Sequence, residues 1–262
     1  MFQSPGDVAF RIFSFPVYYY GIILAFSILT GVYTAYLLYK NFYDEINAKK
    51  IIDFSPFIII TGIIGARLYY CCVNYSYYIN HPLEIFYIRQ GGLSIHGMII
   101  VGILSLFIFS KIYKMPFLKL IDVFLCGTAL GQSIGRWGNF FNSEAFGTPT
   151  NLPWKLYIPV SDRPLQYLGY EYFHPAFLYE SILDLVIFII LLLLFKKVSK
   201  HPGVLACIYL ILYSLVRILI EHLRIDSVLN ISGVPVAQIM SLILILAASI
   251  FMIFILYKDK VD

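Results

Sequence analysis

The sequence predicts an all-α, polytopic membrane protein with seven transmembrane helices, as its composition and its long apolar runs indicate. Hydrophobic residues make up 60% of the 262 residues and charged residues only 13%, against about 25% charged residues in an average soluble protein. Apolar runs of about 18 to 25 residues recur along the chain, and each is long enough to cross roughly 30 Å of hydrocarbon. Water is therefore not the main solvent of this chain.

Seven apolar segments are expected to be helical, because lipid offers no hydrogen-bond partner to an unpaired backbone group. They are residues 17–39, 51–73, 95–113, 117–137, 176–195, 203–223 and 235–257. We expect residues 1–262 to form a single integral membrane domain. The longest connection, residues 138–175, is too long for a simple link, so we expect it to form an external cap between spans four and five.

The basic residues predict how the chain is oriented. Eleven lysines fall on one side of the predicted spans, namely Lys40, Lys49, Lys50, Lys111, Lys114, Lys119, Lys196, Lys197, Lys200, Lys258 and Lys260. Five basic residues fall on the other side, namely Arg11, Arg89, Lys155, Arg163 and Arg224. By the positive-inside rule we expect the N-terminus outside and the C-terminus inside. The net charge of +4 forms no basic patch, which disfavours nucleic acid as a partner.

Three arginines, Arg67, Arg136 and Arg217, lie within the apolar spans, where a cation is costly and usually functional. At 1.5 Å per residue, Arg67 and Arg136 lie about 24 Å and Arg217 about 21 Å above the inner ends of their spans. We therefore expect the three cations to converge at one depth in the outer leaflet. The alternative is that each arginine snorkels to the headgroups on its own.

Other polar residues accompany these arginines on the same helix faces. Gln132, Arg136 and Asn139 share one face of span four by their spacing. On span six, Arg217 and Glu221 are four residues apart, so Glu221 is expected to neutralise or orient Arg217, with a purely structural ion pair as the alternative. Arg224 is expected on that face too. A stripe of glycines spaced by four on span four favours close helix packing; its members are Gly127, Gly131 and Gly135.

His96 follows the pair Gly91-Gly92 at the outer entrance of span three. Its imidazole is therefore expected near the external surface, where it could take up a proton near neutral pH. No metal site is indicated, because the five histidines are scattered and neither His-Glu-x-x-His nor a paired Cys-x-x-Cys occurs. No cofactor is implied either.

The segment after the polar face of span four resembles the signature of the prolipoprotein diacylglyceryl transferase family at every fixed position. It reads Gly135-Arg136-Trp137-Gly138-Asn139-Phe140-Phe141-Asn142-Ser143-Glu144-Ala145-Phe146-Gly147. Residues 91–97, 174–180 and 217–224 resemble further family blocks in the family's order, so the resemblance covers nearly the whole chain. The chain departs from the family before Tyr20, where a basic residue is common, and at His222, where a small residue is common.

This resemblance implies an enzyme of the bacterial cytoplasmic membrane that acts on phosphatidylglycerol and on prolipoprotein precursors with a lipobox cysteine. It would transfer the diacylglyceryl group to the cysteine thiol, form a thioether and release glycerol phosphate. The anionic headgroup lies at the depth expected for the arginines, and guanidinium groups match phosphate oxygens in bidentate geometry.

Candidate site residues follow from the resemblance and from the arginine pattern together. His96 is expected to act as the base for the thiol, and Arg136 and Arg217 are expected to clamp the phosphate. The expected substrate-binding residues are Arg67, Tyr20, Asn139, Asn142, Glu144, Gly147, Tyr179 and Glu221.

Two other classes of protein remain open from the sequence. An anion or lipid transporter would also use intramembrane arginines, although it would be expected to show inverted repeats or paired broken helices, which this sequence lacks. A scaffold or sensor would instead bind its partner through the cap.

Overall fold

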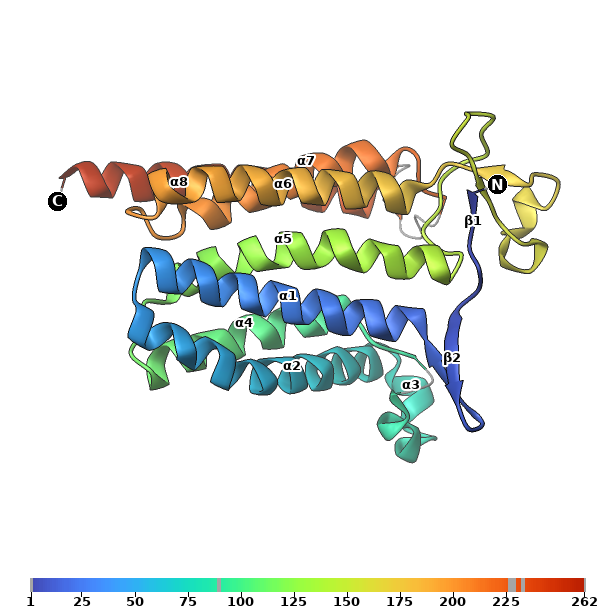
Figure 1. The fold of residues 1–262 in the computed structure, drawn as a ribbon, viewed down its shortest axis with the longest axis horizontal. Helices are drawn as coiled ribbons and strands as arrows, with labels where there is room; N and C mark the ends of the chain where they lie inside the picture. The colour runs from blue at the N-terminus through green and yellow to red at the C-terminus, as the bar shows by residue number, and fades with distance from the viewer. Residues whose placement is uncertain (1, 89–90, 226–229, 232–233, 262) are drawn as a thin grey trace. The chain divides into compact units, whose positions relative to one another are not determined.

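The computed structural model describes residues 2–88, 91–225, 230–231 and 234–261 and is mostly helical (Figure 1). Within these residues, seven helices are long and apolar enough to cross a membrane, as the sequence predicts. They are α1 (Tyr19–Phe42), α2 (Glu45–Val73), α4 (Ile95–Ile112), α5 (Phe117–Phe141), α6 (Ala176–Val198), α7 (Val204–Glu221) and α8 (Val236–Val261). The chain is therefore a multi-pass membrane protein. Arg89 lies outside the described residues.

Two compact units make up the chain. The first unit comprises Met1–Thr34 and Phe124–Asp262, and the second comprises Ala35–Val123. Helices α1 and α5 each contribute residues to both units. The expectation that residues 1–262 form one integral membrane domain stays a prediction.

Helix α5 is the centre of the first unit, where it packs against α1, α6 and α7. A Cβ placed on Gly127 would overlap the carbonyl oxygen of Gly31 in α1, and one on Gly131 would lie 3.2 Å from the carbonyl oxygen of Ser27. The small-residue stripe of span four therefore allows α1 and α5 to approach backbone to backbone, as the spacing predicts.

Buried serines join α5 to α6. The Ser133 hydroxyl donates to the carbonyl oxygen of Ser181 over 2.8 Å, and the Ser181 hydroxyl donates to that of Ser133 over 2.7 Å. Each of these two hydroxyl groups satisfies its polar hydrogen inside the bundle, so the serine pair fixes which face of α6 meets α5.

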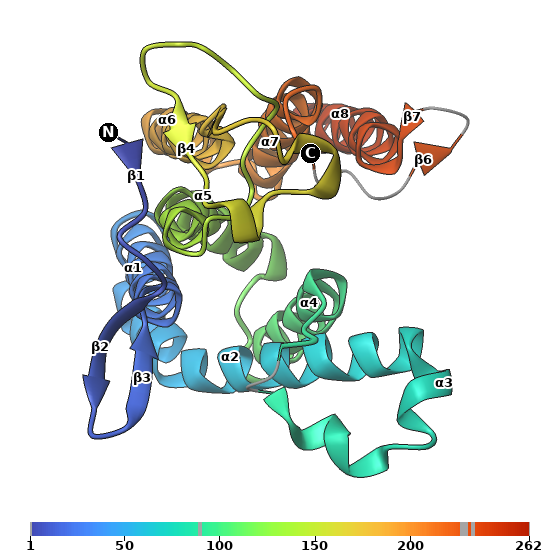
Figure 2. The same ribbon diagram turned by 90° about the vertical axis from the view of Figure 1, so that its right-hand side faces the viewer.

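Helix α7 packs against α6 and α8, and the view along the helices shows α5, α6, α7 and α8 grouped together (Figure 2).

The connection between α5 and α6 contains a small sheet. It contains the strands β4 (Leu156–Tyr157) and β5 (Tyr172–Phe173) and the 3-10 turns η3 (Val160–Asp162) and η4 (Leu165–Tyr167). The N-terminal strand β1 (Phe2–Gln3) pairs parallel with β4, and β4 pairs antiparallel with β5. A buried apolar cluster supports this cap; its members are Phe140, Phe146, Leu156, Ile158, Phe173 and Phe177.

The cap begins later than the sequence predicts, because α5 continues through Gly138 to Phe141. Its sheet is an addition to the predicted all-α architecture. Two hairpins complete the strands, one formed by β2 (Val8–Ile12) and β3 (Phe15–Tyr18) and one formed by β6 (Asn230–Ile231) and β7 (Val234–Pro235).

The second unit is built on the pair α2 and α4. A Cβ on Gly97 would overlap the carbonyl group of Gly65, so these two helices also cross at glycines. The Thr61 and Ser105 hydroxyls lie 2.9 Å apart across the same contact. Between these helices come the short helix α3 (Tyr75–Tyr78) and the 3-10 turn η1 (Pro82–Phe86).

Replacing Gly127 by Ala should destabilise the first unit by about 1–3 kcal/mol, because the new methyl group overlaps the Gly31 carbonyl. The matched change Gly21→Ala adds a methyl group on α1 with no described atom within 4 Å, and should be neutral or stabilising by up to about 1 kcal/mol. Reversible unfolding of both variants in mixed micelles measures the difference. Equal unfolding free energies for the two variants would contradict the close contact of α1 and α5.

Candidate functional site

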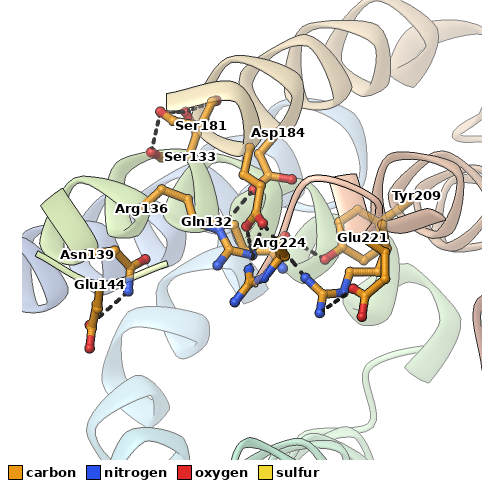
Figure 3. A network of polar contacts seen from close by, with 12 residues as sticks. Gln132, Ser133, Arg136, Asn139, Glu144, Ser181, Asp184, Tyr209, Glu221 and Arg224 are labelled. Atoms are coloured by element: carbon orange, nitrogen blue, oxygen red, sulfur yellow. Dashed lines mark hydrogen bonds and ion pairs between the residues drawn. The ribbon is translucent and has the colours of Figure 1, made fainter. Parts of the chain in front are cut away.

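Three arginines of the first unit meet at one buried carboxylate, that of Glu180 on α6. Figure 3 shows Arg136 and Arg224 of this group, with Asp184 and Glu221 nearby. Arg136 of α5 forms an ion pair with Glu180 Oε2 through its Nη2. Arg224 donates a hydrogen bond from Nη1 to Oε1 over 2.7 Å, and Arg217 Nη1 lies 3.8 Å from the same oxygen. The Glu180 side chain is only 4% exposed, so the arginines take the place of water around its charge.

Two more acidic side chains complete the arrangement. Glu221 Oε2 lies 2.8 Å from Arg217 Nη2, one helical turn away, which confirms the predicted pairing. Asp184, one turn after Glu180 on α6, places Oδ2 3.9 Å from Arg136 Nε. We call these six residues the arginine–carboxylate cluster: Arg136, Arg217, Arg224, Glu180, Asp184 and Glu221. Three cations and three carboxylates give a net charge of zero, which lowers the cost of burying them.

Arg136 and Arg217 line the same small cavity. Glu180, Asp184 and Tyr213 form other parts of its wall, together with the apolar side chains of Val216 and Ile220 on α7. The sequence placed these two arginines at one depth, and the structure brings them together. Two guanidinium groups beside one cavity can hold an anion that enters it.

Arg136 and Arg217 are held by ion pairs with the carboxylates of the cluster. A guanidinium group carries five N–H donors, more than one carboxylate oxygen can accept. Each arginine can therefore contact its carboxylate partner and a ligand at the same time.

Arg67 of the second unit differs from these arginines, because its guanidinium group donates hydrogen bonds to backbone carbonyl oxygens. Its Nε donates to the carbonyl oxygen of Ile85 over 2.9 Å, and Nη1 donates to those of Gly91 and Gly92 over 3.0 Å each. Its Nη2 donates to the carbonyl oxygen of Glu84. Arg67 thus ties α2 to the segment before α4, and its expected role in substrate binding stays a prediction.

His96 is also in the second unit. It is exposed on the first turn of α4, and its ring stacks on Tyr69 with centroids 5.9 Å apart. Gly91 and Gly92 both have positive φ, of 88° and 71°, as a tight turn before the helix requires. The predicted convergence of Arg67 with Arg136 and Arg217 and the role of His96 as base stay predictions.

The signature segment forms a tight turn around Glu144. The side-chain amides of Asn139 and Asn142 donate to Glu144 Oε1 over 2.9 Å and 3.3 Å. Ser143 and Ala145 on either side of this residue both have φ of 53°. Nearby, the ring of Tyr20 packs directly on Gly138, where a Cβ would lie 2.7 Å from it. The structure therefore assembles the predicted residues of this segment around one carboxylate.

Gly147 lets the cap reach the segment that carries Arg224. It forms an isolated β-bridge with Arg224, and its N–H donates to the carbonyl oxygen of His174 over 2.8 Å. A Cβ here would lie 2.8 Å from the carbonyl oxygen of Leu223. Although α7 ends at Glu221, the Arg224 N–H still donates to the carbonyl oxygen of Ile220, and Arg224 reaches the same Glu180 oxygen as Arg217, as the spacing predicts.

Tyr179 contacts the cap. Its hydroxyl accepts a hydrogen bond from Trp154 Nε1 over 2.7 Å and lies 3.2 Å from His174 Nδ1. The side chain therefore joins the start of α6 to two cap residues, and its expected contact with substrate stays a prediction.

Sequence reasoning missed the central role of Glu180 and overlooked Asp184 altogether. The signal was available, since two acidic residues four apart in an apolar span are as unusual as the arginines. Gln132 was placed on the correct face; its Oε1 accepts a hydrogen bond from the Tyr209 hydroxyl over 2.7 Å. Within the described residues, no group of three His, Cys, Asp or Glu side chains could hold a metal ion.

Seven candidate spans and a buried arginine–carboxylate cluster define a polytopic membrane protein with a charged site inside its helix bundle. The family model described as prolipoprotein diacylglyceryl transferase matches residues 7–254. The chain therefore belongs to the prolipoprotein diacylglyceryl transferase family, and it is a membrane enzyme with that transferase activity.

Individual relatives are similar over almost their full length. A Synechocystis sp. protein named phosphatidylglycerol–prolipoprotein diacylglyceryl transferase is 44% identical over 268 residues, covering 100% of this chain and 94% of the relative. Proteins of the same name from Nostoc sp. and Thermosynechococcus vestitus are 46% and 40% identical, covering 92% and 99% of this chain and 86% and 96% of the relatives. The transferase predicted from the sequence is thus confirmed over the transporter and scaffold alternatives.

Glu180→Gln should lower the unfolding free energy by about 3 kcal/mol, because removing one charge leaves buried arginines without their shared partner. The exposed Glu144, which only accepts hydrogen bonds from amides, is the matched control, and Glu144→Gln should change stability by about 0.5 kcal/mol or less. Denaturant unfolding in micelles compares the two. A Glu180→Gln protein as stable as the control would contradict the shared-carboxylate arrangement.

Proposed function

We propose that this enzyme transfers the diacylglyceryl group of phosphatidylglycerol to the thiol of a lipobox cysteine in a prolipoprotein, with Arg136 and Arg217 holding the lipid phosphate. The names of the relatives support the two substrates. One observation carries the assignment of the site: both arginines line one cavity.

The phosphate competes with Glu180 for these guanidinium groups. Arg136 is held by ion pairs with Glu180 and Asp184, and a phosphate oxygen can take the place of a carboxylate oxygen because both carry negative charge. Arg224, which does hydrogen-bond to Glu180, holds this carboxylate in place meanwhile. A planar guanidinium group then binds two phosphate oxygens at once.

The same cations favour the reaction. The sulfur attacks the glycerol carbon that bears the phosphate ester, the carbon–oxygen bond breaks, and glycerol phosphate leaves as a thioether forms. Negative charge therefore grows on the phosphate in the transition state. Preplaced arginines stabilise that charge more than they stabilise the bound lipid, which lowers the barrier.

Other members of the predicted set act around this pair. Glu221 orients Arg217 across one helical turn. Asn139, Asn142 and Glu144 form a polar turn that binds or orients substrate, and Tyr20 lies beside it. The roles of Arg67, Gly147 and Tyr179 in substrate binding are part of the same proposal.

His96 is proposed as the base that removes the thiol proton. An unperturbed thiol has a pKa of about 8.5, so at neutral pH a base is useful. Support comes from the resemblance of residues 91–97 to a family block and from the exposure of the His96 ring at the start of α4.

The lysine distribution supports an orientation with the N-terminus and the cap outside and the C-terminus in the cytoplasm of a bacterial cell. In that orientation the signature segment that follows Arg136 lies toward the outer surface, where a secreted precursor presents its cysteine.

The experiment that tests the function uses the purified chain, phosphatidylglycerol and a lipobox peptide. We expect glycerol phosphate to be released only when the peptide contains its cysteine, together with a peptide mass increased by one diacylglyceryl group. Release that does not depend on the cysteine, or movement of lipid without release, would contradict the proposal.

Arg136→Lys should lower turnover more than tenfold, because lysine keeps the charge but loses the two-pronged contact with phosphate oxygens. The exposed Arg11 supplies the control, since Arg11→Lys changes the same residue type outside the cavity. Steady-state release of glycerol phosphate measures both variants. Near-normal turnover of Arg136→Lys would exclude bidentate binding by this residue.

His96→Gln should give a rate that keeps rising with pH up to thiol ionisation, near about pH 8.5, because the variant depends on spontaneous loss of the thiol proton. His81→Gln, at an exposed histidine of the same unit, should keep the profile of the unmodified enzyme. The measurement is kcat against pH. An unchanged profile for His96→Gln would remove His96 as the base.

A further inference from the structure

Asp184 is the carboxylate of the cluster that its surroundings neutralise least. Glu180 contacts three guanidinium groups, and Glu221 lies 2.8 Å from one. Within the described residues, Asp184 forms one ion pair, with Arg136 Nε at 3.9 Å, and its Oδ2 accepts no hydrogen bond. Its side chain is 2% exposed, so water does not compensate for this weak pairing.

The charge of the cluster changes when substrate enters. Three arginines and three carboxylates are balanced before binding, and the phosphodiester of the lipid adds one negative charge inside the bundle. An uncompensated buried charge is costly, and a buried carboxyl group avoids it by taking up a proton. Protonation loses the least ion-pair energy at the carboxylate that has the weakest ion pair.

The surroundings of Asp184 single it out for this proton. The charged and titratable groups that face it are Arg136 from α5, Glu180 from its own helix α6, and Tyr209, Tyr213 and Arg217 from α7. Asp184 and both proposed phosphate-binding arginines line the cavity together. A proton on Asp184 would therefore lie beside the phosphate.

We propose that Asp184 is a further catalytic residue, which takes up one proton as the anionic headgroup enters the cavity and gives it to the departing phosphate. This inference rests on the proposed function. As the sulfur–carbon bond forms, the electron pair of the broken carbon–oxygen bond passes to the phosphate oxygen. Asp184 protonates that oxygen, and glycerol phosphate leaves as a monoanion.

The protons balance over one turnover. Asp184 takes a proton from water when the lipid binds, and the base that removes the thiol proton returns one to water. The net result is transfer of the thiol proton to the product phosphate, and Asp184 ends as a carboxylate in a neutral cluster.

The test compares Asp184→Asn with Asp184→Glu in the purified full chain, using short-chain phosphatidylglycerol and a lipobox peptide. Asparagine resembles the protonated acid in shape and charge but has no acidic proton to give. We expect Asp184→Asn to bind the lipid without proton uptake and to lower kcat by about 100-fold, as loss of a general acid does. Asp184→Glu should restore part of kcat and the proton uptake.

Two readouts separate a catalytic from a structural role. Calorimetry in buffers of different ionisation enthalpy should show about one proton taken up per lipid bound by the unmodified enzyme, as charge compensation requires. Its kcat should fall at alkaline pH, because the acid form is lost, and this decline should be missing in Asp184→Asn. A variant with the kcat, alkaline decline and proton uptake of the unmodified enzyme would overturn the inference.

Two other results would also overturn the inference. The first is a raised KM and reduced stability of Asp184→Asn with an intact alkaline decline, since that would assign Asp184 a structural role. The second is release of glycerol phosphate by the unmodified enzyme without dependence on the peptide cysteine, which would overturn the proposed function as well. If the unmodified enzyme transfers normally and Asp184→Asn is unaffected, only the role of Asp184 is overturned.

Discussion

The site depends on one interaction, the sharing of the Glu180 carboxylate by three arginines inside a membrane-spanning helix bundle. A carboxylate that is 4% exposed cannot stay ionised without partners, and arginines in an apolar span have the same need. The buried carboxylate therefore stays charged because the arginines are beside it, and the arginines stay charged because the carboxylate is beside them. The helices α5, α6 and α7 must bring these residues together, and the glycine and serine contacts of α5 allow them to do so.

This sharing also leaves the site able to react. Because Arg136 and Arg217 share Glu180 with Arg224, each keeps guanidinium donors that this one carboxylate does not occupy. Arg67 shows the opposite solution, in which four backbone carbonyl groups take up the guanidinium donors and the residue serves to hold its segment. The two environments differ in what surrounds the guanidinium group, which is backbone for Arg67 but carboxylates and a cavity for Arg136 and Arg217.

The sequence predicted the spans well, because hydropathy and length report directly on the solvent around each helix. It also predicted that Arg136 meets Arg217 and that Glu221 pairs with Arg217, since depth and helical spacing follow from position alone. It did not predict Glu180 as the shared partner, because the face that α6 turns to α5 depends on packing around Ser133 and Ser181. The backbone bonds of Arg67 and the bridge that holds Arg224 depend on loop geometry, which spacing does not report.

The central claim is that one lipid phosphate takes the place of Glu180 beside the guanidinium groups of Arg136 and Arg217. A structure of the enzyme in a bilayer with bound phosphatidylglycerol tests it most directly. The account predicts phosphate oxygens within about 3 Å of guanidinium nitrogens of both arginines, the distance of a charge-assisted hydrogen bond. A phosphate bound elsewhere, with both arginines still paired to Glu180, would contradict it.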